Sequence, residues 1–351
     1  MSPTPPRTPP LPIVEVVIDA AVGRTTPLDT ILMTTGGYCV ARALQVVADL
    51  AVADFVGELP CPIDDVARSS GTNADALGRV LALLSAHGIF SVDGPSVAHN
   101  DASRLLRTDH PQSARDLARM FGLPFFWETF QELEHTVRTG RPATEKAHPE
   151  GSWAWLSARP DANAVFNGAM AGKSFGQVAG VIECFDFSRF GRIADIGGGR
   201  GHLLHAILDK WPSASGVLFD LPHVIAEASA PEHGRMQLQA GDFFEDELPA
   251  CDAYVLMEVI HDWADDQAGR ILSAVARAAP PGAGLLIIEQ LMPDSGVPHW
   301  ARMLDIHMMA LFAARQRSSD EYDALARRAG FSRVGTVDTP AGISILEYRR
   351  D

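Results

Sequence analysis

Short apolar runs alternate with helical stretches over the second half of the chain, from residue 192 onward. Continuous apolar runs of this length are typical of strands buried on both faces, and intervening helices allow such strands to pair in parallel. The alternation predicts a doubly wound α/β sheet with an antiparallel pair of strands at the end of the chain. The predicted strands are RIADI (192–196), SGVLFD (215–220), MQLQA (236–240), DAYVLM (252–257), GLLIIE (284–289), SRVGTV (332–337) and ISILEY (343–348).

The first half of the chain has helical periodicity. Residues 30–56 repeat apolar groups every three or four positions, which predicts helices with a broad buried face. The pair Gly36 and Gly37 indicates a break or a close contact between these helices. Residues 63–94 contain two amphipathic segments separated by a Ser-Ser-Gly turn, followed by a short IFSVDG hairpin. This arrangement has the outline of a winged helix.

Further helices, rich in large side chains, are predicted for residues 103–182, and ordinary helix packing is the simplest interpretation of those side chains. The changes of pattern divide the chain into four parts. These are a disordered proline-rich leader (1–20), a winged-helix domain (21–105), a helical bridge (106–182) and an α/β domain (183–351).

Charge and composition limit the partners of the protein. The formal net charge is -15, and the winged-helix segment between Cys61 and Gly94 has only Arg68 and Arg79 as strong bases. Nucleic-acid binding needs clustered positive charge, so this composition argues against DNA. No run of about 18 apolar residues predicts a membrane span. The four cysteines lack the spacing of a metal site or a disulfide framework, which indicates a reducing, cytoplasmic location.

The first strand of the α/β half leads into the loop DIGGGRG, with glycines at 197, 199 and 201. Glycines let the backbone approach a ligand closely at the start of a helix. The dinucleotide pattern GxGxxG fails, because the sixth position from Gly197 is His202, and the phosphate-loop pattern GxxxxGK[ST] is also missing from the sequence. The remaining common ligand for such a loop is S-adenosylmethionine.

Two aspartates follow at the ends of the next two strands. Asp220 lies 19 residues beyond Gly201, where an acidic side chain is expected to accept hydrogen bonds from a ribose. The segment AGDFF puts Gly241 and Asp242 at the carboxyl edge of the sheet, where Asp242 is suited to accept from an adenine amino group. Either aspartate alone is as often a turn or capping residue. The ordered spacing of the whole set is what favours a cofactor site.

With these motifs the sequence resembles the class I S-adenosylmethionine-dependent O-methyltransferases that act on small molecules, including plant caffeate-type, hydroxyindole and bacterial antibiotic-tailoring enzymes. The resemblance covers roughly residues 25–350. The motifs that carry it are DIGGGRG (195–201), FDLP (219–222), GDFF (241–244), HDW (261–263), IIEQLMP (287–293) and FNGAM (166–170).

The resemblance implies a Rossmann-like methyltransferase domain with an N-terminal winged-helix dimerisation domain, assembled as a homodimer. The implied reaction is methyl transfer from S-adenosylmethionine to a hydroxyl of a small phenolic, quinol or polycyclic metabolite, without a metal. His261 is the implied general base, and Glu289 is the implied partner of its second ring nitrogen. Implied cofactor contacts are Asp195, Gly197, Gly199, Gly201, Asp220, Leu221, Gly241, Asp242 and Phe243. Implied substrate contacts are Phe166, Met170, Trp127, Trp155, Met308 and Asp305.

The segment VIHDWADD (259–266) also has a metal-site interpretation, in which carboxylates join the histidine. Its aspartates, Asp262, Asp265 and Asp266, are better explained as the polar start of a helix near residue 265, where acidic groups complement the helix dipole. The second interpretation fits better, because metal-dependent catechol methyltransferases generally lack a winged helix.

The segment AARQRS (313–318) departs from the pattern GGRERT that relatives commonly have. Gln316 therefore occupies the position of a glutamate. An amide can hydrogen-bond to the imidazole or the substrate but cannot stabilise an imidazolium by charge, so His261 is expected to depend more heavily on Glu289. The departure also leaves open a cofactor-binding enzyme of the same fold with non-methylating chemistry, such as hydroxylation, decarboxylation or pericyclic rearrangement.

Overall fold

The computed structural model describes residues 26–230 and 234–351 and divides them into two compact units. One unit holds residues 26–134 and Ala143–Phe175, and the other holds His135–Pro142 and Gly176–Asp351. The predicted leader (1–20) lies outside the described residues. The predicted domain limits at residues 105 and 182 stay predictions.

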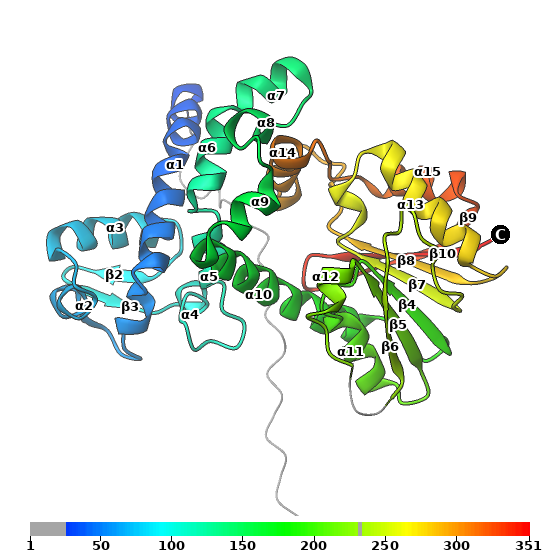
Figure 1. Cartoon of the computed structure of the whole chain (residues 1–351). Coiled ribbons are helices and arrows are strands. Elements are labelled where there is room, and N and C mark those ends of the chain that lie inside the picture. The colour runs from blue at the N-terminus through cyan, green and yellow to red at the C-terminus, as the bar shows by residue number, and fades with distance from the viewer. Residues whose placement is uncertain (1–25, 231–233) are drawn as a thin grey trace, which may run out of the picture. The chain divides into compact units, whose positions relative to one another are not determined.

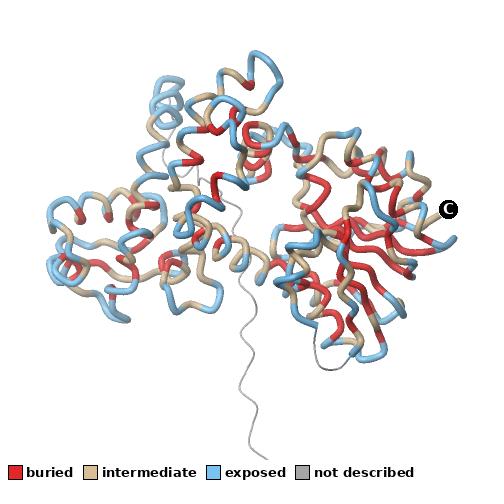
Figure 2. The backbone as a smooth tube through the Cα atoms, viewed as in Figure 1, coloured by how far each residue is buried: buried red, intermediate tan, exposed pale blue. Residues whose placement is uncertain are grey.

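The first unit begins with the long helix α1 (Pro27–Asp49), which starts at a capping box formed by Thr26 and Asp29. The helix continues through Gly36 and Gly37 without interruption, and a Cβ added at either glycine would meet nothing within 4 Å. The expectation of a break or a close contact at this pair was therefore wrong for this chain. The buried residues of α1 are confined to its last turns, and most of its apolar side chains are exposed (Figure 2).

The predicted winged helix follows α1 and the short helix η1 (Val52–Phe55) (Figure 1). Helix α2 (Ile63–Ser70) ends at Gly71, whose φ of 67° closes the helix, and α3 (Ala74–Ala86) starts at Asn73, which accepts from the N–H of Ala76 at 3.0 Å. Three short antiparallel strands form the wing in the order β1-β3-β2. They are β1 (Cys61–Pro62), β2 (Ser91–Asp93) and β3 (Ser96–Ala98).

Further helices follow, as the sequence predicts for residues 103–182. Helices α7 and α10 run across the division between the units. The helices are α4 (Asp101–Arg104), α5 (Arg115–Met120), α6 (Pro124–Gln131), α7 (Leu133–Thr139), α8 (Thr144–Ala147), α9 (Ser152–Ser157) and α10 (Pro160–Cys184).

A seven-stranded sheet forms the centre of the second unit, in the order β6-β5-β4-β7-β8-β10-β9. Strands β4 to β8 pair in parallel, and β10 is antiparallel to both β8 and β9. Each predicted strand is present, with its ends shifted by two residues at most. The strands are β4 (Arg192–Ile196), β5 (Ser215–Asp220), β6 (Met236–Ala240), β7 (Ala253–Met257), β8 (Gly284–Glu289), β9 (Phe331–Asp338) and β10 (Ser344–Arg350).

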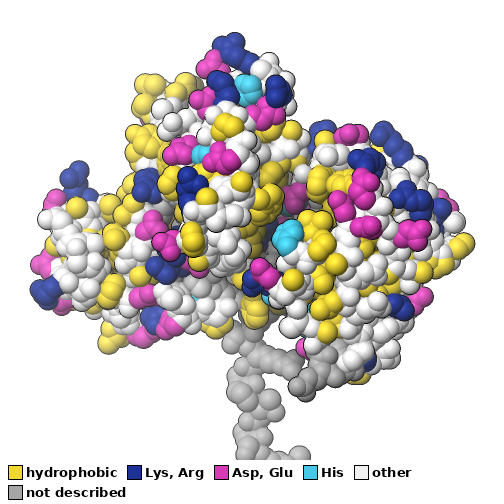
Figure 3. Space-filling model, viewed as in Figure 1, with side chains coloured by type: hydrophobic (Ala, Val, Ile, Leu, Met, Phe, Trp, Pro, Cys, Tyr) yellow, Lys and Arg dark blue, Asp and Glu magenta, His cyan; other side chains and the backbone are white. Residues whose placement is uncertain are grey.

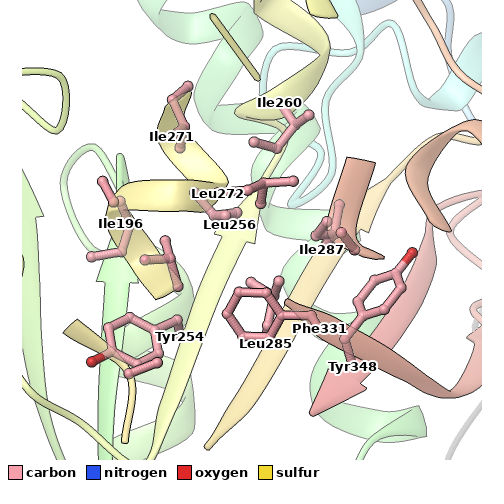
Figure 4. Close-up of a cluster of buried hydrophobic side chains, with 14 of the residues drawn as sticks. Ile196, Tyr254, Leu256, Ile260, Ile271, Leu272, Leu285, Ile287, Phe331 and Tyr348 are labelled. Carbon is pink, nitrogen blue, oxygen red and sulfur yellow. The ribbon is translucent and has the colours of Figure 1, made fainter. Parts of the chain in front are cut away.

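Alternate side chains of each strand point to opposite faces of the sheet, and the central strands are apolar on both faces. Helices therefore cover both faces. On one face, Tyr254 and Leu285 pack against α13 (Asp265–Ala278) and α15 (Ser319–Arg328) (Figure 4). On the other face, Val255 and Leu286 pack against α11 (His202–Lys210) and the end of α10. The remaining helices of the unit are α12 (Pro222–Ile225), η2 (Ile260–Asp262) and α14 (Trp300–Phe312).

Candidate active site

The loop between β4 and α11 is built on glycines in the left-handed region of φ. Positive φ angles of 68°, 61° and 81° occur at Gly197, Gly199 and Gly201. A Cβ on Gly198 would lie 2.4 Å from Cγ of Asp195, and one on Gly197 would lie 3.1 Å from Val259. Conformation therefore disfavours side chains at the three glycines with positive φ, and lack of space excludes one at Gly198, which leaves the backbone at these positions open to a ligand.

Asp195 lies beneath this loop at the carboxyl end of β4 and is only 2% exposed. Its Oδ2 has no hydrogen-bond partner among the described residues. Burial, and then the nearby charge of Asp220, raise the pKa of the Asp195 carboxyl to about 7. A ligand with a cationic group fits such a carboxyl, because it would supply the missing partner. S-adenosylmethionine carries an ammonium and a sulfonium, so the loop and Asp195 fit this cofactor.

The next strands end at the same edge of the sheet. Asp220 at the end of β5 accepts a hydrogen bond from the N–H of Gly199 at 2.8 Å, and burial raises the pKa of its carboxyl. After β6, Asp242 accepts from the N–H of Phe244 at 2.8 Å. A Cβ on Gly241 would lie 2.6 Å from the ring of Phe219, so this turn requires glycine. The structure thus gathers the predicted cofactor residues at one edge, while their ligand contacts stay predictions.

His261 lies in the turn η2, directly after the carboxyl end of β7, and is 5% exposed. Its Nδ1 is 2.8 Å from the side-chain amide of Gln316 and 3.4 Å from Oε2 of Glu289. Its Nε2 is 3.3 Å from Oδ1 of Asp262. The three predicted catalytic residues therefore meet, with Nδ1 as the ring atom that the glutamate and the amide share.

Glu289 ends strand β8 and is fully buried. Its Oε1 accepts hydrogen bonds from the backbone N–H groups of Ile260 and His261, at 2.9 and 3.2 Å. Burial raises the pKa of this carboxyl to about 7, although the charge of His261 lowers it. Glu289 thus holds the backbone of the turn as well as facing the imidazole.

Two further residues fix this site, and sequence reasoning missed the role of each. Asp305 on α14, predicted as a substrate contact, accepts from the backbone N–H of Gln316 at 2.8 Å. Arg317 is 1% exposed and donates to the carbonyls of Ile260 and Trp263, at 3.0 and 2.7 Å. Its Nη2 also lies 2.8 Å from Oδ1 of Asp265. No local pattern in AARQRS distinguishes the buried arginine from its exposed neighbour Arg315.

The aspartates of the segment 259–266 have separate roles. Asp265 and Asp266 lie in the first turn of α13, as predicted, and Asp265 is also the partner of Arg317. Asp262 instead belongs to η2, beside the imidazole of His261. No group of three or more His, Cys, Asp or Glu residues in the described part of the chain is placed to hold a metal ion.

The predicted substrate contacts are distributed over both units. Met308 on α14 is 9% exposed and packs with Leu304 and Ala314. In the other unit, the ring of Trp155 is 4% exposed, with its centroid 5.3 Å from that of Phe125. Such burial favours a core role for this tryptophan. Three further predicted contacts on that unit, each partly buried, are Trp127, Phe166 and Met170.

Comparisons with known proteins agree with this geometry. The O-methyltransferase domain model matches residues 130–332, and the O-methyltransferase dimerisation domain model matches residues 32–109. A phenazine O-methyltransferase of Lysobacter antibioticus is 37% identical over 92% of this chain and 96% of its own length. An 8-amino-8-demethylriboflavin N,N-dimethyltransferase of Streptomyces davaonensis is 37% identical over 88% of this chain and 92% of its own length.

Among solved structures, an O-methyltransferase of neocarzinostatin biosynthesis is 30% identical and has a TM-score of 0.69, covering 89% of this chain and 96% of that one. It was crystallised with S-adenosyl-L-homocysteine and 1,4-dihydroxy-2-naphthoic acid. The matched domains, the relatives and the fold together lead to one family. The chain belongs to the S-adenosylmethionine-dependent O-methyltransferases, which methylate small aromatic secondary metabolites.

Proposed function

We propose that this enzyme methylates a hydroxyl oxygen of a small phenolic, quinol or polycyclic metabolite, with His261 as the general base. The observation that carries the proposal is the position of His261 and Glu289 at the carboxyl ends of β7 and β8, next to the glycine loop after β4. In open α/β sheets this edge binds the ligands, so cofactor and base would meet there. The reaction belongs to secondary metabolism, as it does in the named relatives.

The residues expected to hold the cofactor are those gathered at this edge, with Asp195, Asp220 and Asp242 as the acidic members. The bound cofactor supplies a methyl group that is already activated by a positively charged sulfur. The protein therefore has to align the acceptor oxygen with that methyl group and exclude water. Among residues of this unit, Met308 is expected to contact the acceptor ring, since a methionine side chain adapts to flat surfaces.

His261 is the residue expected to take the acceptor proton. As the new oxygen–carbon bond forms and the sulfur–carbon bond breaks, the hydroxyl proton passes to Nε2, while Nδ1 stays against Gln316 and Glu289. Base assistance of this kind typically contributes about 100-fold to 10,000-fold in rate. Glu289 is the partner expected to keep the ring oriented, because it binds the backbone of the same turn.

Methylation of an arylamine is the second candidate, because one relative at 37% identity is named as an N,N-dimethyltransferase. A neutral amine attacks through its own lone pair and releases its proton afterwards, so it depends less on a base. The two candidates differ in their response to loss of His261. Non-methylating chemistry would be favoured if the enzyme converted an acceptor without producing S-adenosylhomocysteine.

We also propose that the enzyme is a cytoplasmic homodimer formed through its dimerisation domain. Helix α1 has the length and mean hydropathy, 1.3, of a membrane-crossing helix. The dimerisation match covers most of that helix, which favours a second subunit as the cover of its apolar face. Figure 3 shows hydrophobic side chains gathered over α1. The exposed set on α1 is Leu28, Ile31, Leu32, Met33 and Tyr38, each 59% to 63% exposed.

The proposal is tested with methyl-labelled cofactor and a panel of phenols, quinols, phenazines and arylamines. The wild-type enzyme is expected to label a hydroxyl compound. The variant His261→Ala should lose at least about 100-fold of that rate while cofactor affinity, measured by calorimetry, changes little. Exposed His87→Ala, on the wing side of α3, is the matched control and should keep the wild-type rate. Full activity of His261→Ala on a hydroxyl compound would rule out the base assignment, and labelling of arylamines alone would support the second candidate.

A further inference from the structure

The side chain of Gln177 on α10 is buried, and only half of its amide has a partner. Gln177 is 6% exposed, and its Nε2 donates to Oε1 of Glu258 at 3.2 Å. An ionised carboxylate can only accept, so this contact fixes which end of the amide is the NH₂ group. The remaining atom, Oε1 of Gln177, is buried and has no hydrogen-bond partner among the described residues. A buried acceptor without a partner is costly, so a ligand that donates a hydrogen bond is expected there.

Glu258, the partner of Gln177, has an unusual backbone conformation. It directly follows strand β7 and has a φ of 53°, which is rare for a residue other than glycine. Its N–H donates to the carbonyl of Ile288 on β8 at 2.9 Å, so the pairing of the two strands holds the residue in place. Such a conformation is costly and occurs preferentially at active sites and ligand sites. The backbone at Glu258 therefore indicates a functional role for this residue.

Glu258 lies at the point where the order of strands in the sheet reverses. From β4 the chain continues to β5 and β6 on one side, and it returns to β7 and β8 on the other. Ligands of open α/β sheets bind in the crevice at this point, outside the carboxyl ends of the strands. Val259, next to Glu258, faces the glycine loop after β4, because a Cβ on Gly197 would lie 3.1 Å from its side chain. Glu258 and Gln177 are thus beside that loop, at the edge where the cofactor is expected.

The charge of Glu258 also reaches the proposed catalytic residues. Burial is the main reason that the pKa of the Glu289 carboxyl is raised to about 7, and the charge of Glu258 adds to this effect. Because charge interactions weaken with distance, Glu258 is near the carboxyl that faces His261 as well as near the glycine loop. A ligand group bound by Gln177 and Glu258 would therefore belong to one of the reacting molecules.

The expected layout of the cofactor decides which of its groups reaches this pair. Asp220 and Asp242, at and after the ends of β5 and β6, are the residues expected to bind the ribose and the adenine. The amino-acid end of the cofactor then extends the other way, toward β7 and α10. That end has a carboxylate, which the charge of Glu258 would repel, and an ammonium with three N–H donors. The buried oxygen of Gln177 and the carboxylate of Glu258 are both acceptors, so they suit the ammonium.

We propose that Gln177 and Glu258 bind the ammonium group of S-adenosylmethionine, an inference that rests on the cofactor site proposed above. Oε1 of Gln177 accepts one hydrogen bond from the ammonium, and the carboxylate of Glu258 accepts another. A carboxylate has about four lone-pair sites, so Glu258 can accept from the ammonium and from its neighbours in the protein at once. Asp195, beneath the glycine loop, remains a further partner for the positive charge of the cofactor. A fixed amino-acid end helps to align the sulfonium methyl group with the acceptor oxygen.

Calorimetry with S-adenosylhomocysteine and with its deamino analogue, which lacks only the amino group, tests the role of the ammonium. The wild type should bind S-adenosylhomocysteine at least about tenfold more tightly than the analogue, because hydrogen bonds to charged groups are strong. In Glu258→Gln and in Gln177→Leu this ratio should fall at least about threefold, through weaker binding of S-adenosylhomocysteine, while the affinity for the analogue stays equal or rises. Glu183→Gln, which removes an exposed carboxylate from the same helix α10, is the matched control and should keep the wild-type ratio.

The outcomes separate this inference from the cofactor site itself. Equal affinity of the wild type for the two compounds, or the wild-type ratio in both variants, would overturn the inference and leave the cofactor site intact. Equal loss of affinity for both compounds would assign a structural role to the pair and would also overturn it. A wild type that binds neither compound would overturn the proposed cofactor site and this inference with it.

Steady-state kinetics distinguish two other uses of the pair. If Glu258 acted only through Glu289, Glu258→Gln would shift the pH profile of kcat and leave the calorimetric ratio unchanged. If the pair bound an amino group of the acceptor, the two variants would raise the KM of amine-bearing acceptors alone. We expect instead that both variants raise the KM for S-adenosylmethionine at least about threefold. Either of the other two results would overturn the assignment of the pair to the cofactor.

Discussion

Two buried acidic residues, Asp195 and Glu289, have carboxyl groups with unusually high pKa values. Asp195 lies near the carboxyl end of β4 and Glu289 at the carboxyl end of β8, so both lie at the same edge of the sheet. Burial raises the pKa of each carboxyl to about 7. Both groups bind protons more tightly in the folded state than in the unfolded chain, where carboxyls titrate near pH 4. Unfolded carboxyls therefore lose their protons first as the pH rises. The free energy of unfolding should fall between about pH 4 and pH 7, and remain low above pH 7.

Asp195→Asn tests this sign in the ligand-free protein. The variant removes a carboxyl whose charge is costly to bury, so it should be more stable than the wild type at pH 8 by about 2–4 kcal/mol, and the difference should vanish toward pH 4. Urea unfolding at fixed protein concentration between pH 4 and pH 8 measures the difference. Asp209→Asn, on the exposed side of α11, is the control and should follow the wild type. A gain in stability that is largest at low pH would contradict the assigned direction. Cofactor affinity of Asp195→Asn should fall, since the partner for its cationic groups is lost.

At the scale of elements, the turn η2 depends on a buried arginine from a distant segment. Arg317 binds two carbonyls of that turn and the Asp265 carboxylate at the start of α13. Arg317→Met should therefore leave buried carbonyls without donors and lower the free energy of unfolding by about 3 kcal/mol or more. Thermal and urea unfolding measure this loss.

Arg315 provides a matched comparison for that prediction. It also faces Asp265, at 3.9 Å, but its side chain is 51% exposed. Exposed ion pairs contribute at most about 1 kcal/mol, so Arg315→Met should change stability by less than that. Similar losses for the two variants would show that η2 does not depend on the buried arginine.

The strands and helices also show which features of the fold can be predicted from the sequence. Continuous apolar runs such as SGVLFD and GLLIIE predicted their strands, because both faces of a central strand are covered by helices. Helical periodicity, in contrast, does not reveal which partner covers an apolar face, so the broad buried face expected for residues 30–56 is largely exposed in the single chain. Gly36 and Gly37 likewise fit within a continuous helix, since glycine lowers helix stability without ending the helix.

The candidate site was predictable where its residues follow strands. His261, Glu289, Asp220 and Asp242 each come directly after or at the end of a predicted strand, so parallel pairing brings them to one edge. The contact of Gln316 with the imidazole and the fixing of its backbone by Asp305 arise from tertiary packing between α14 and the turn η2. Local sequence patterns do not predict such packing.

At the scale of the whole molecule, the exposed face of α1 requires a cover. Monomeric proteins rarely expose a contiguous row of large apolar side chains, and a two-fold dimer would bury this row from each subunit. Leu28 and Leu32 lie four positions apart, on one face of the helix, and are 63% and 59% exposed. The double variant Leu28→Glu/Leu32→Glu puts two charges on that face of each subunit. It should weaken dimerisation by at least about 100-fold, since each buried leucine is worth about 1.5–3 kcal/mol.

Light scattering at micromolar concentration should give twice the chain mass of 37.7 kDa for the wild type and the single chain mass for the double variant. Circular dichroism should stay unchanged, because these side chains contribute little to the core of their own subunit. Val334→Glu, at a 49% exposed position on β9, is the control and should remain dimeric. A wild-type enzyme that is monomeric, or a double variant that stays dimeric, would contradict the assignment of α1 to the dimer interface. If the variant is monomeric and also inactive on a naphthol that the wild type methylates, the second subunit is needed for the reaction as well as for the cover of α1.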